Sequence, residues 1–375
     1  MSCPILQFGT GRFLQAHVDL FVSEALAARD ALGRIAVVQT TESAESSRRL
    51  AALATGRAYH VKVRGLRDGL AVDETVRVDV VGAAWNAARD WRHILDAITD
   101  DAQVIVSNTA DRGYELSLVD GAHAVTRDTT APASFPAKLV VLLHHRWRTR
   151  ASAPLTILPC ELVQCNGDAL RDIVVGLAAS WRLPEEFVAY LRTHCVWVNS
   201  LVDRIVSGAL EPIGAIAEPY ALWAIEHRER MVLPCRHDAI VVTPELAKYE
   251  RLKLMLLNLG HTYLVERWLT NGQAPAATVR GAMSDKDLSA ELEAVWNDEV
   301  IPVFDAIGEG IEARAYLNDV RDRFRNPFLE HRLADIARDH AEKKRRRFGP
   351  AIDLASLQRP PIDQPRLRAA LADAN

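Results

Sequence analysis

The 375-residue sequence is poor in cysteine and holds no cysteine pair at metal-binding spacing. Its five cysteines form no CxxC pair, and Cys160 and Cys165 have no matching second pair to complete a zinc site. We therefore expect reduced thiols, as in the cytoplasm, and no metal ligands. The five are Cys3, Cys160, Cys165, Cys195 and Cys235.

The sequence also lacks long apolar runs and an excess of positive charge. No apolar run approaches the ~20 residues that span a bilayer, and a strand pattern begins at Pro4, which leaves no room for a signal peptide. The formal net charge of −4 argues against a non-specific nucleic-acid binder. We expect a cytoplasmic protein that acts on a small molecule, without membrane or nucleic acid, as a monomer or homodimer.

Short apolar runs alternate with amphipathic helical patterns through the first part of the chain. This alternation predicts βαβ units and a parallel sheet. The length favours two domains, and 49% hydrophobic with 25% charged residues is the usual globular mixture. The expected strands are 4–8, 35–38, 61–63, 75–81, 104–107 and 155–158, and the expected helices among them are 13–28 and 91–98.

From Thr243 onward the pattern is almost wholly helical, with Thr243 as N-cap and Pro244 in the first turn. The sequence thus predicts an α/β fold, with a Rossmann-type parallel-sheet domain in 1–242 and an α-helical domain in 243–375. The basic run Lys343–Arg347 fits a solvated helix end, and a phosphate- or partner-binding role is the alternative. The expected helices are 243–269, 285–307 with a kink or break at Pro302, 311–320 and 327–346.

The turn Gly9-Thr10-Gly11 follows the first strand and opens a helix. Glycines there let a backbone approach the diphosphate of a dinucleotide, and the helix N-terminus supplies N–H donors. Leu14 occupies the usual third glycine position, so the motif is incomplete and a simple turn is the alternative. The second strand runs into Gln39-Thr40-Thr41-Glu42 without an acid at its end, so we expect NAD with NADP not excluded.

Lys253, Asn258 and His261 stand on an otherwise apolar helical segment. At 100° per residue they project within one arc, and polar groups on a buried helix need partners or a cavity. One interpretation is a structural hydrogen-bond cluster or a lysine that reaches solvent. The other is catalysis: burial lowers the pKa of Lys253 so that it acts as acid and base, while Asn258 stabilises a developing oxyanion.

Several segments, in order along nearly the whole chain, resemble the long-chain mannitol dehydrogenase family. This family contains polyol dehydrogenases, mannitol-1-phosphate dehydrogenase and the fructuronate and tagaturonate reductases. Within it, the chain looks most like the tagaturonate reductases, although it is shorter than a typical hexuronate reductase. The segments are 8–13 with 16–17, 107–109, 134–138, 159–161 with 166–167, 199–204, 253 with 258 and 261, and 323–327; 218–223 adds to the tagaturonate reductase likeness.

The resemblance implies a Rossmann-type domain, a helical domain, and Lys253 as a metal-independent acid/base. It implies that Asn166 and Asn258 stabilise the substrate oxygen and that His261 orients the substrate. It also places Asp203 and Asn199 near the substrate. The residues alone would make Asn166 part of a turn and Asp203 part of an ion pair. We expect the cofactor to contact Gly9, Thr10, Gly11, Arg12, Phe13, Thr40 and Asn108.

These expectations combine into an NAD(H)-dependent oxidoreductase that interconverts a keto-sugar acid of the tagaturonate or fructuronate type and its aldonate, such as altronate. A polyol 2-dehydrogenase of the mannitol type is the alternative, and a sugar-phosphate dehydrogenase is less favoured. A non-catalytic NAD-sensing protein on the same fold is the rival from another class, and the Lys253, Asn258 and His261 set argues against it.

Overall fold

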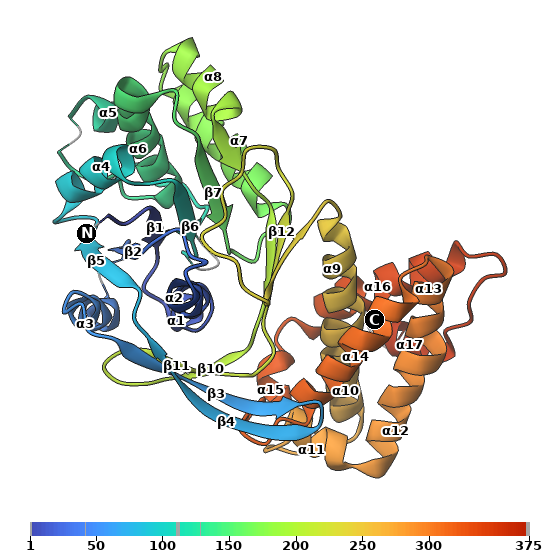
Figure 1. Cartoon of the computed structure of the whole chain (residues 1–375). Coiled ribbons are helices and arrows are strands. Elements are labelled where there is room, and N and C mark those ends of the chain that lie inside the picture. Colours follow the sequence, from blue (N-terminus) through green and yellow to red (C-terminus); the bar gives the residue numbers. More distant parts are fainter. Residues whose placement is uncertain (1, 42, 110–112, 128, 373–375) are drawn as a thin grey trace. The chain divides into compact units, whose positions relative to one another are not determined.

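The computed structural model describes residues 2–41, 43–109, 113–127 and 129–372. The chain divides into two compact units, whose elements are labelled in Figure 1. Unit 2 takes in two short segments that precede residue 243, so neither unit is one continuous stretch of sequence. Unit 1 comprises Met1–Lys62, Thr75–Ala217 and Ala221–Leu246, and unit 2 comprises Val63–Glu74, Glu218–Tyr220 and Ala247–Asn375.

Unit 1 is built on a six-stranded parallel sheet in the order β5-β2-β1-β6-β7-β8. Numbered by strands of this sheet alone, the order is 3-2-1-4-5-6, the arrangement of dinucleotide-binding folds. Five of the strands are buried along their whole length because helices cover both faces. The strands are β1 Ile5–Phe8, β2 Ile35–Gln39, β5 Val81–Asn86, β6 Val104–Ser107, β7 Leu155–Pro159 and β8 Cys195–Trp197.

Helices α4, α6, α7 and α8 gather on one side of this sheet, and α1 to α3 lie on the other (Figure 1). One apolar core joins the sheet to the helices, with Phe8, Ile105 and Leu139 among its fully buried members. The helices are α1 Arg12–Ala16, α2 Val18–Ala28, α3 Ala44–Leu53, α4 Trp91–Asp100, α5 His123–Arg127, α6 Phe135–Arg150, α7 Asn166–Ser180 and α8 Glu185–Thr193.

The helix expected at 13–28 is interrupted at His17, whose backbone leaves the helical region with φ −123° and ψ −85°. The imidazole packs between Phe13 and Phe21, with ring centroids 4.8 and 4.5 Å away. Such packing of rings depends on the folded structure, so the helical periodicity of the sequence could not predict the interruption at His17. The result is a short α1 directly after the glycine turn, followed by the longer α2.

Seven further strands form two smaller sheets, of order β10-β11-β3-β4 and β13-β12-β9. The single strand expected at 75–81 is wrong: 75–78 end β4 and Val81 begins β5, which belongs to the parallel sheet. The two are nearly continuous in sequence, so apolar spacing alone does not separate them. The strands are β3 Tyr59–Arg67, β4 Leu70–Val78, β9 Ser200–Asp203, β10 Val206–Ala209, β11 Gly214–Ala217, β12 Leu222–Glu226 and β13 Ile240–Thr243.

Unit 2 is mainly helical around a second apolar core that includes Leu256, Trp296 and Phe348. None of the described helices is long and apolar enough to cross a membrane. Its elements are α9 Leu246–Leu252, π-helix η1 Lys253–Asn258, α10 Leu259–Thr270, α11 Val279–Ser284, α12 Lys286–Ala294, π-helix η2 Val295–Val300, α13 Ile301–Ala306, α14 Gly310–Phe324, α15 Leu333–Ile336, α16 His340–Ser356 and α17 Pro365–Ala372.

Two of the expected C-terminal helices need correction. The helix expected at 327–346 is wrong, because only the four-residue α15 forms before α16 begins at His340 and runs on to Ser356. At Pro302 the chain does not break: the π turn η2 ends just before it, and Pro302 stands in the first turn of α13, where a missing N–H costs little.

Candidate functional site

The glycine turn after β1 lies at the point where the order of the parallel sheet reverses, between β1 and β6. Gly9 has φ +127°, and a Cβ there would stand 2.6 Å from the carbonyl oxygen of Asn108, just after β6. Only glycine fits so close to that backbone. Open space surrounds Gly11, so a ligand can approach its backbone closely. Ligands of open parallel sheets bind in the crevice at this point.

The missing third glycine of the motif has a local explanation. Leu14 is buried, and its Cδ1 would lie 2.9 Å from a Cβ on Gly9, so leucine fills the space against the turn. Thr10 is buried and its carbonyl accepts a hydrogen bond from Gln15 Nε2 at 2.9 Å. Arg12 is exposed and Phe13 is partly buried.

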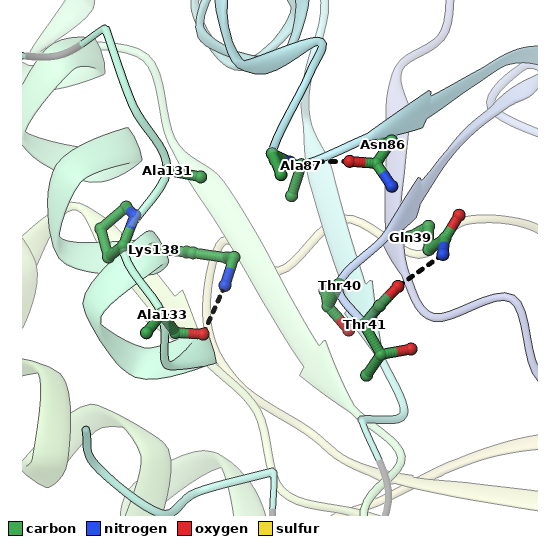
Figure 2. Close-up of a pocket in the computed structure, with 10 residues that line it drawn as sticks. Gln39, Thr40, Thr41, Asn86, Ala87, Ala131, Ala133 and Lys138 are labelled. Atoms are coloured by element: carbon green, nitrogen blue, oxygen red, sulfur yellow. Dashed lines mark hydrogen bonds between the residues drawn. The ribbon is translucent and has the colours of Figure 1, made fainter. Parts of the chain in front are cut away.

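A cavity of about 280 Å³ lies beyond the carboxyl ends of β2 and β5 (Figure 2). Thr40 and Thr41 line it from the β2 side, and Lys138 faces them from α6. Burial lowers the pKa of Lys138 to about 8, and its amine donates to the carbonyl of Ala133 at 2.7 Å. None of the described lining residues is acidic, and Glu42 lies outside the described residues.

A buried carboxylate ties the ends of β6 and β7 together. Glu161 accepts hydrogen bonds from the Ser107 hydroxyl and from the backbone and hydroxyl of Thr109, each at 2.9 Å. Burial raises the pKa of Glu161, and these hydrogen bonds act against that shift. Asn108 donates from its amide to the Cys160 carbonyl at 3.0 Å. The expected contact of Asn108 with a cofactor stays a prediction.

Asn166 begins α7 and is 1% exposed. Its amide nitrogen donates to the carbonyls of Pro159, Glu161 and Ser200, and its oxygen accepts from the backbone of Gly167 and Ser200. The side chain therefore fastens three segments of unit 1. Direct contact with a substrate oxygen stays a prediction and would exchange one of these bonds for the ligand.

The two expected substrate-binding residues of unit 1 are both buried. Asn199 accepts from the backbone of Asp168 and donates to the carboxylates of Asp168 and Glu226, each at 2.8 Å. Asp203 ends β9. Arg204 after it donates to the carbonyl of Ala16 at 2.5 Å. A role for Asn199 and Asp203 toward substrate stays a prediction.

Lys253, Asn258 and His261 lie on the continuous helix formed by α9, η1 and α10. Within it the backbone hydrogen bonds change from the α-helical to the π-helical pattern and back. Residues 253–258 form a π turn, which replaces the α-helical geometry assumed from the sequence. An i→i+5 ladder aligns residues five apart, so Asn258 follows Lys253 on one face, and His261 follows three residues later in α10. π turns of this kind occur often at functional sites. Lys253 and Asn258 are partly buried and His261 is buried.

Trp296 supports this turn from the second π turn. Its indole Nε1 donates to the Leu256 carbonyl at 3.1 Å, inside the first π turn. Gly260 lets the indole approach, since a Cβ there would stand 2.6 Å from Trp296 Cζ2. A bulky indole packed on a glycine thus fixes the segment that carries Lys253 and Asn258.

His261 is held as a neutral imidazole. Burial is the main reason that its pKa lies well below 6.5, and the neighbouring His331 with the charges of Arg323 and Arg347 lowers it further. The ring stacks on Phe324 at 4.3 Å and meets the His331 ring edge-on at 4.8 Å. A neutral ring with a fixed plane can donate or accept a hydrogen bond toward a hydroxylated ligand.

The basic run of α16 was expected as a solvated helix end, and for three of its residues this is wrong. Lys343 is partly buried and donates to the carbonyl of Ile336 at 2.9 Å. Lys344 is 2% exposed and donates to Glu266 Oε2 at 2.9 Å, and Arg347 is partly buried against α10. Every third or fourth residue of α16 faces α10, a spacing that a run of like charges hides. Arg345 and Arg346 are exposed, as expected.

The described residues contain no cluster suited to a metal ion and no disulfide, and Cys165 is the exposed one of five free thiols. Sequence reasoning missed several residues that shape the candidate sites. Lys138 belonged to a recognised segment but received no role, and Arg347 was recognised only as part of the basic run. Trp296 gave no signal because its partner is distant in sequence. The cavity residues Thr41 and Asn86 could have been found by following strand ends.

The sheet order and the glycine turn at its switch point define a dinucleotide-binding protein of the Rossmann class. The chain belongs to the mannitol dehydrogenase family. The mannitol dehydrogenase Rossmann domain matches residues 3–233, and the mannitol dehydrogenase C-terminal domain matches residues 245–372. This confirms the expected family and the expected α/β fold with a helical C-terminal part.

Relatives named altronate oxidoreductase match most of the chain. The protein of Halalkalibacterium halodurans is 32% identical over 370 residues, which cover 93% of this chain and 70% of the relative. The protein of Klebsiella pneumoniae strain 342 is 32% identical over 394 residues, covering 98% and 78%. These names agree with the expected class, a dehydrogenase acting on CH–OH groups.

Two solved structures share the fold. A substrate-free D-sorbitol dehydrogenase superposes with a TM-score of 0.85 at 20% identity, covering all of this chain and 80% of its own. Mannitol 2-dehydrogenase of Pseudomonas fluorescens, solved with NAD and D-mannitol, gives a TM-score of 0.75 at 20% identity, covering all of this chain and 79% of its own.

Proposed function

We propose that this chain is an NAD(H)-dependent oxidoreductase that interconverts a keto-sugar acid and its aldonate. The observation that carries the proposal is the row of Lys253, Asn258 and His261 on one face of a π-bulged helix. The names of the altronate oxidoreductase relatives favour a sugar acid as substrate. The domain limits that go with this proposal are 1–242 for the cofactor and 243–375 for the substrate.

The residues of unit 1 fit a dinucleotide. Gly11 leaves open space for a diphosphate at the N-terminus of α1, with Gly9, Thr10, Arg12 and Phe13 beside it. The cavity at Thr40 would take the adenosine end, and Asn108, which follows β6 at the switch point, would contact the nicotinamide end. When bound, NAD accepts the hydride and NADH donates it. The described cavity lining has no carboxylate to repel a 2′-phosphate, so NADPH is tested beside NADH.

The proton is handled by this chain's own residues. The Lys253 amine takes the hydroxyl proton when the alcohol is oxidised and returns it when the ketone is reduced. Asn258 donates a hydrogen bond to the oxygen on which charge develops. His261, neutral at working pH, orients the substrate hydroxyls. The substrate roles of Asn166, Asp203 and Asn199 in unit 1 are part of the same proposal.

A substrate panel tests this proposal. The protein is assayed by nicotinamide absorbance with tagaturonate, fructuronate, fructose, mannitol and sorbitol, each with the NAD(H) and the NADP(H) form of the cofactor. We expect NADH-linked reduction of a keto-uronate with a kcat/KM at least about tenfold above that of any neutral sugar. Faster oxidation of mannitol or sorbitol would instead support the polyol dehydrogenase alternative, and cofactor binding without turnover would support a sensor.

A further inference from the structure

The positive side chains that α16 presents to α10 are not all paired with a carboxylate. His340 and Lys344, on the face of α16 toward α10, both donate to Glu266 Oε2, at 2.7 and 2.9 Å. Arg347 lies on the same face, three residues beyond Lys344, and no carboxylate lies within ion-pair distance of it among the described residues. The charge of the buried Lys344 is thus balanced by a carboxylate, whereas the charge of Arg347 is not balanced by one among the described residues.

The contacts of Arg347 leave part of its guanidinium available. Nη1 donates to the hydroxyl of Thr262 at 2.8 Å and points to the carbonyl of Asn258 at 3.4 Å. Nε and Nη2 make no hydrogen bond with the described residues and are not sealed from solvent. Burial lowers the pKa of Arg347, no acidic neighbour acts against that, and the group stays charged because its ordinary value is so high.

The position of Arg347 is close to the proposed substrate row. Thr262, to which it is bonded, adjoins His261 in sequence, and Asn258 is the residue whose carbonyl faces the guanidinium. The charge of Arg347 also lowers the pKa of His261. His331 faces the same imidazole, and Arg323 is neutralised by Glu218 at 2.8 Å. Arg347 is therefore the cation near this row that lacks a described acidic partner.

We propose that Arg347 binds the carboxylate of the sugar-acid substrate beside Asn258 and His261. The inference rests on the proposed function and sharpens it, because it names the residue that distinguishes an acid from a neutral sugar. A guanidinium is planar and holds a carboxylate through two parallel N–H donors. A partly buried cation without a counter-charge gains most from an anionic ligand, since the ligand replaces the water that the cation has lost.

The test compares a keto-uronate with the neutral ketose of the same carbon skeleton in the whole protein. Arg347→Gln keeps a donor for Thr262 but removes the charge, and Arg347→Lys keeps the charge but loses the planar fork. Arg346→Met is the matched control, because Arg346 is exposed one residue earlier on the same helix. A ketose 1-phosphate forms a third substrate arm.

We expect Arg347→Gln to lower kcat/KM for the keto-uronate on the order of 10²-fold, mainly through KM, and to leave the neutral ketose within a few-fold. Arg347→Lys should lose less, again for the acid alone, and Arg346→Met should change neither.

Equal losses for acid and ketose in both variants would overturn the inference, since they indicate a purely structural role at Asn258 and Thr262. A loss greatest for the phosphate would also overturn it. If the unaltered protein reduces the keto-uronate and Arg347→Gln retains its full preference, the inference fails while the proposed function stands. If the unaltered protein does not reduce the keto-uronate, both fail.

Discussion

Asp19 is a carboxylate that folding removes almost completely from water. It stands in the first turn of α2, is 1% exposed, and accepts a hydrogen bond from the Tyr59 hydroxyl at 2.7 Å. Burial raises its pKa to about 6, and hydrogen bonds from Tyr59 and Gln7 offset only part of that. A group whose pKa is higher in the folded state holds its proton longer there, so its charge opposes folding at neutral pH.

Asp19→Asn should therefore change the pH dependence of stability. The folded pKa lies above the ordinary 3.8, so between about pH 4 and pH 6 the native protein binds more protons and its stability falls as pH rises. The amide cannot ionise, so the variant should gain on the order of 2–3 kcal/mol relative to the parent between pH 4 and pH 8. Denaturant unfolding at both pH values measures this, with the exposed Asp100→Asn as control. The same change of unfolding free energy with pH in variant and parent would contradict this prediction.

The roles of single residues could be predicted from the sequence only where their partners are close along the chain. Gly9 and Gly11 were found because a turn after a strand is a local pattern. Asn166 was assigned toward the substrate by resemblance, whereas five hydrogen bonds with backbone groups define its place in the structure, two of them with Ser200, 34 positions away. Arg347 was recognised only as part of a basic run, because its partners lie 85 and 89 positions away.

At the scale of elements, the widened helix of unit 2 is the feature that matters most. A π turn is less favourable than α-helix on its own, so packing must hold it. Trp296 does so by bonding to the Leu256 carbonyl and resting on Gly260. The apolar spacing predicted a helix over 243–269, and a helix does run from Leu246 to Thr270, although Thr243 ends β13 and lies before its start. The spacing could not indicate the change of hydrogen-bond ladder, which depends on a tryptophan some 40 residues away.

Gly260→Ala should disturb this element. The new Cβ would stand 2.6 Å from Trp296 Cζ2, and that ring is fully buried, so we expect a loss of about 1–3 kcal/mol in the free energy of unfolding. The kcat should fall further than the loss of stability alone explains, because Lys253 and Asn258 belong to the π turn that the new methyl displaces. The control is Gly349→Ala in α16, where nothing lies within 4 Å of the added methyl and helix propensity favours alanine. Equal effects of the two substitutions on unfolding and on kcat would argue against the role of Trp296.

For the whole molecule, the sequence predicted a parallel-sheet part and a helical part. It did not predict which short segments belong to each of the two units. Buried runs such as 104–107 stood out, because parallel strands are apolar on both faces. The segments Val63–Glu74 and Glu218–Tyr220 group with the helical unit, where Glu218 forms its buried ion pair with Arg323. Such an assignment depends on contacts between distant segments, and periodicity along the chain does not carry that information.

The proposed mechanism depends above all on Lys253 as the group that moves the proton. The most direct measurement is turnover by Lys253→Ala with the cofactor and keto-uronate that the panel identifies. We predict a fall in kcat of about 10²–10⁴-fold, with the dissociation constant of NADH unchanged and partial recovery on adding a small primary amine. A variant that keeps its turnover, or loses it only in step with its folding stability, would contradict the proposed mechanism.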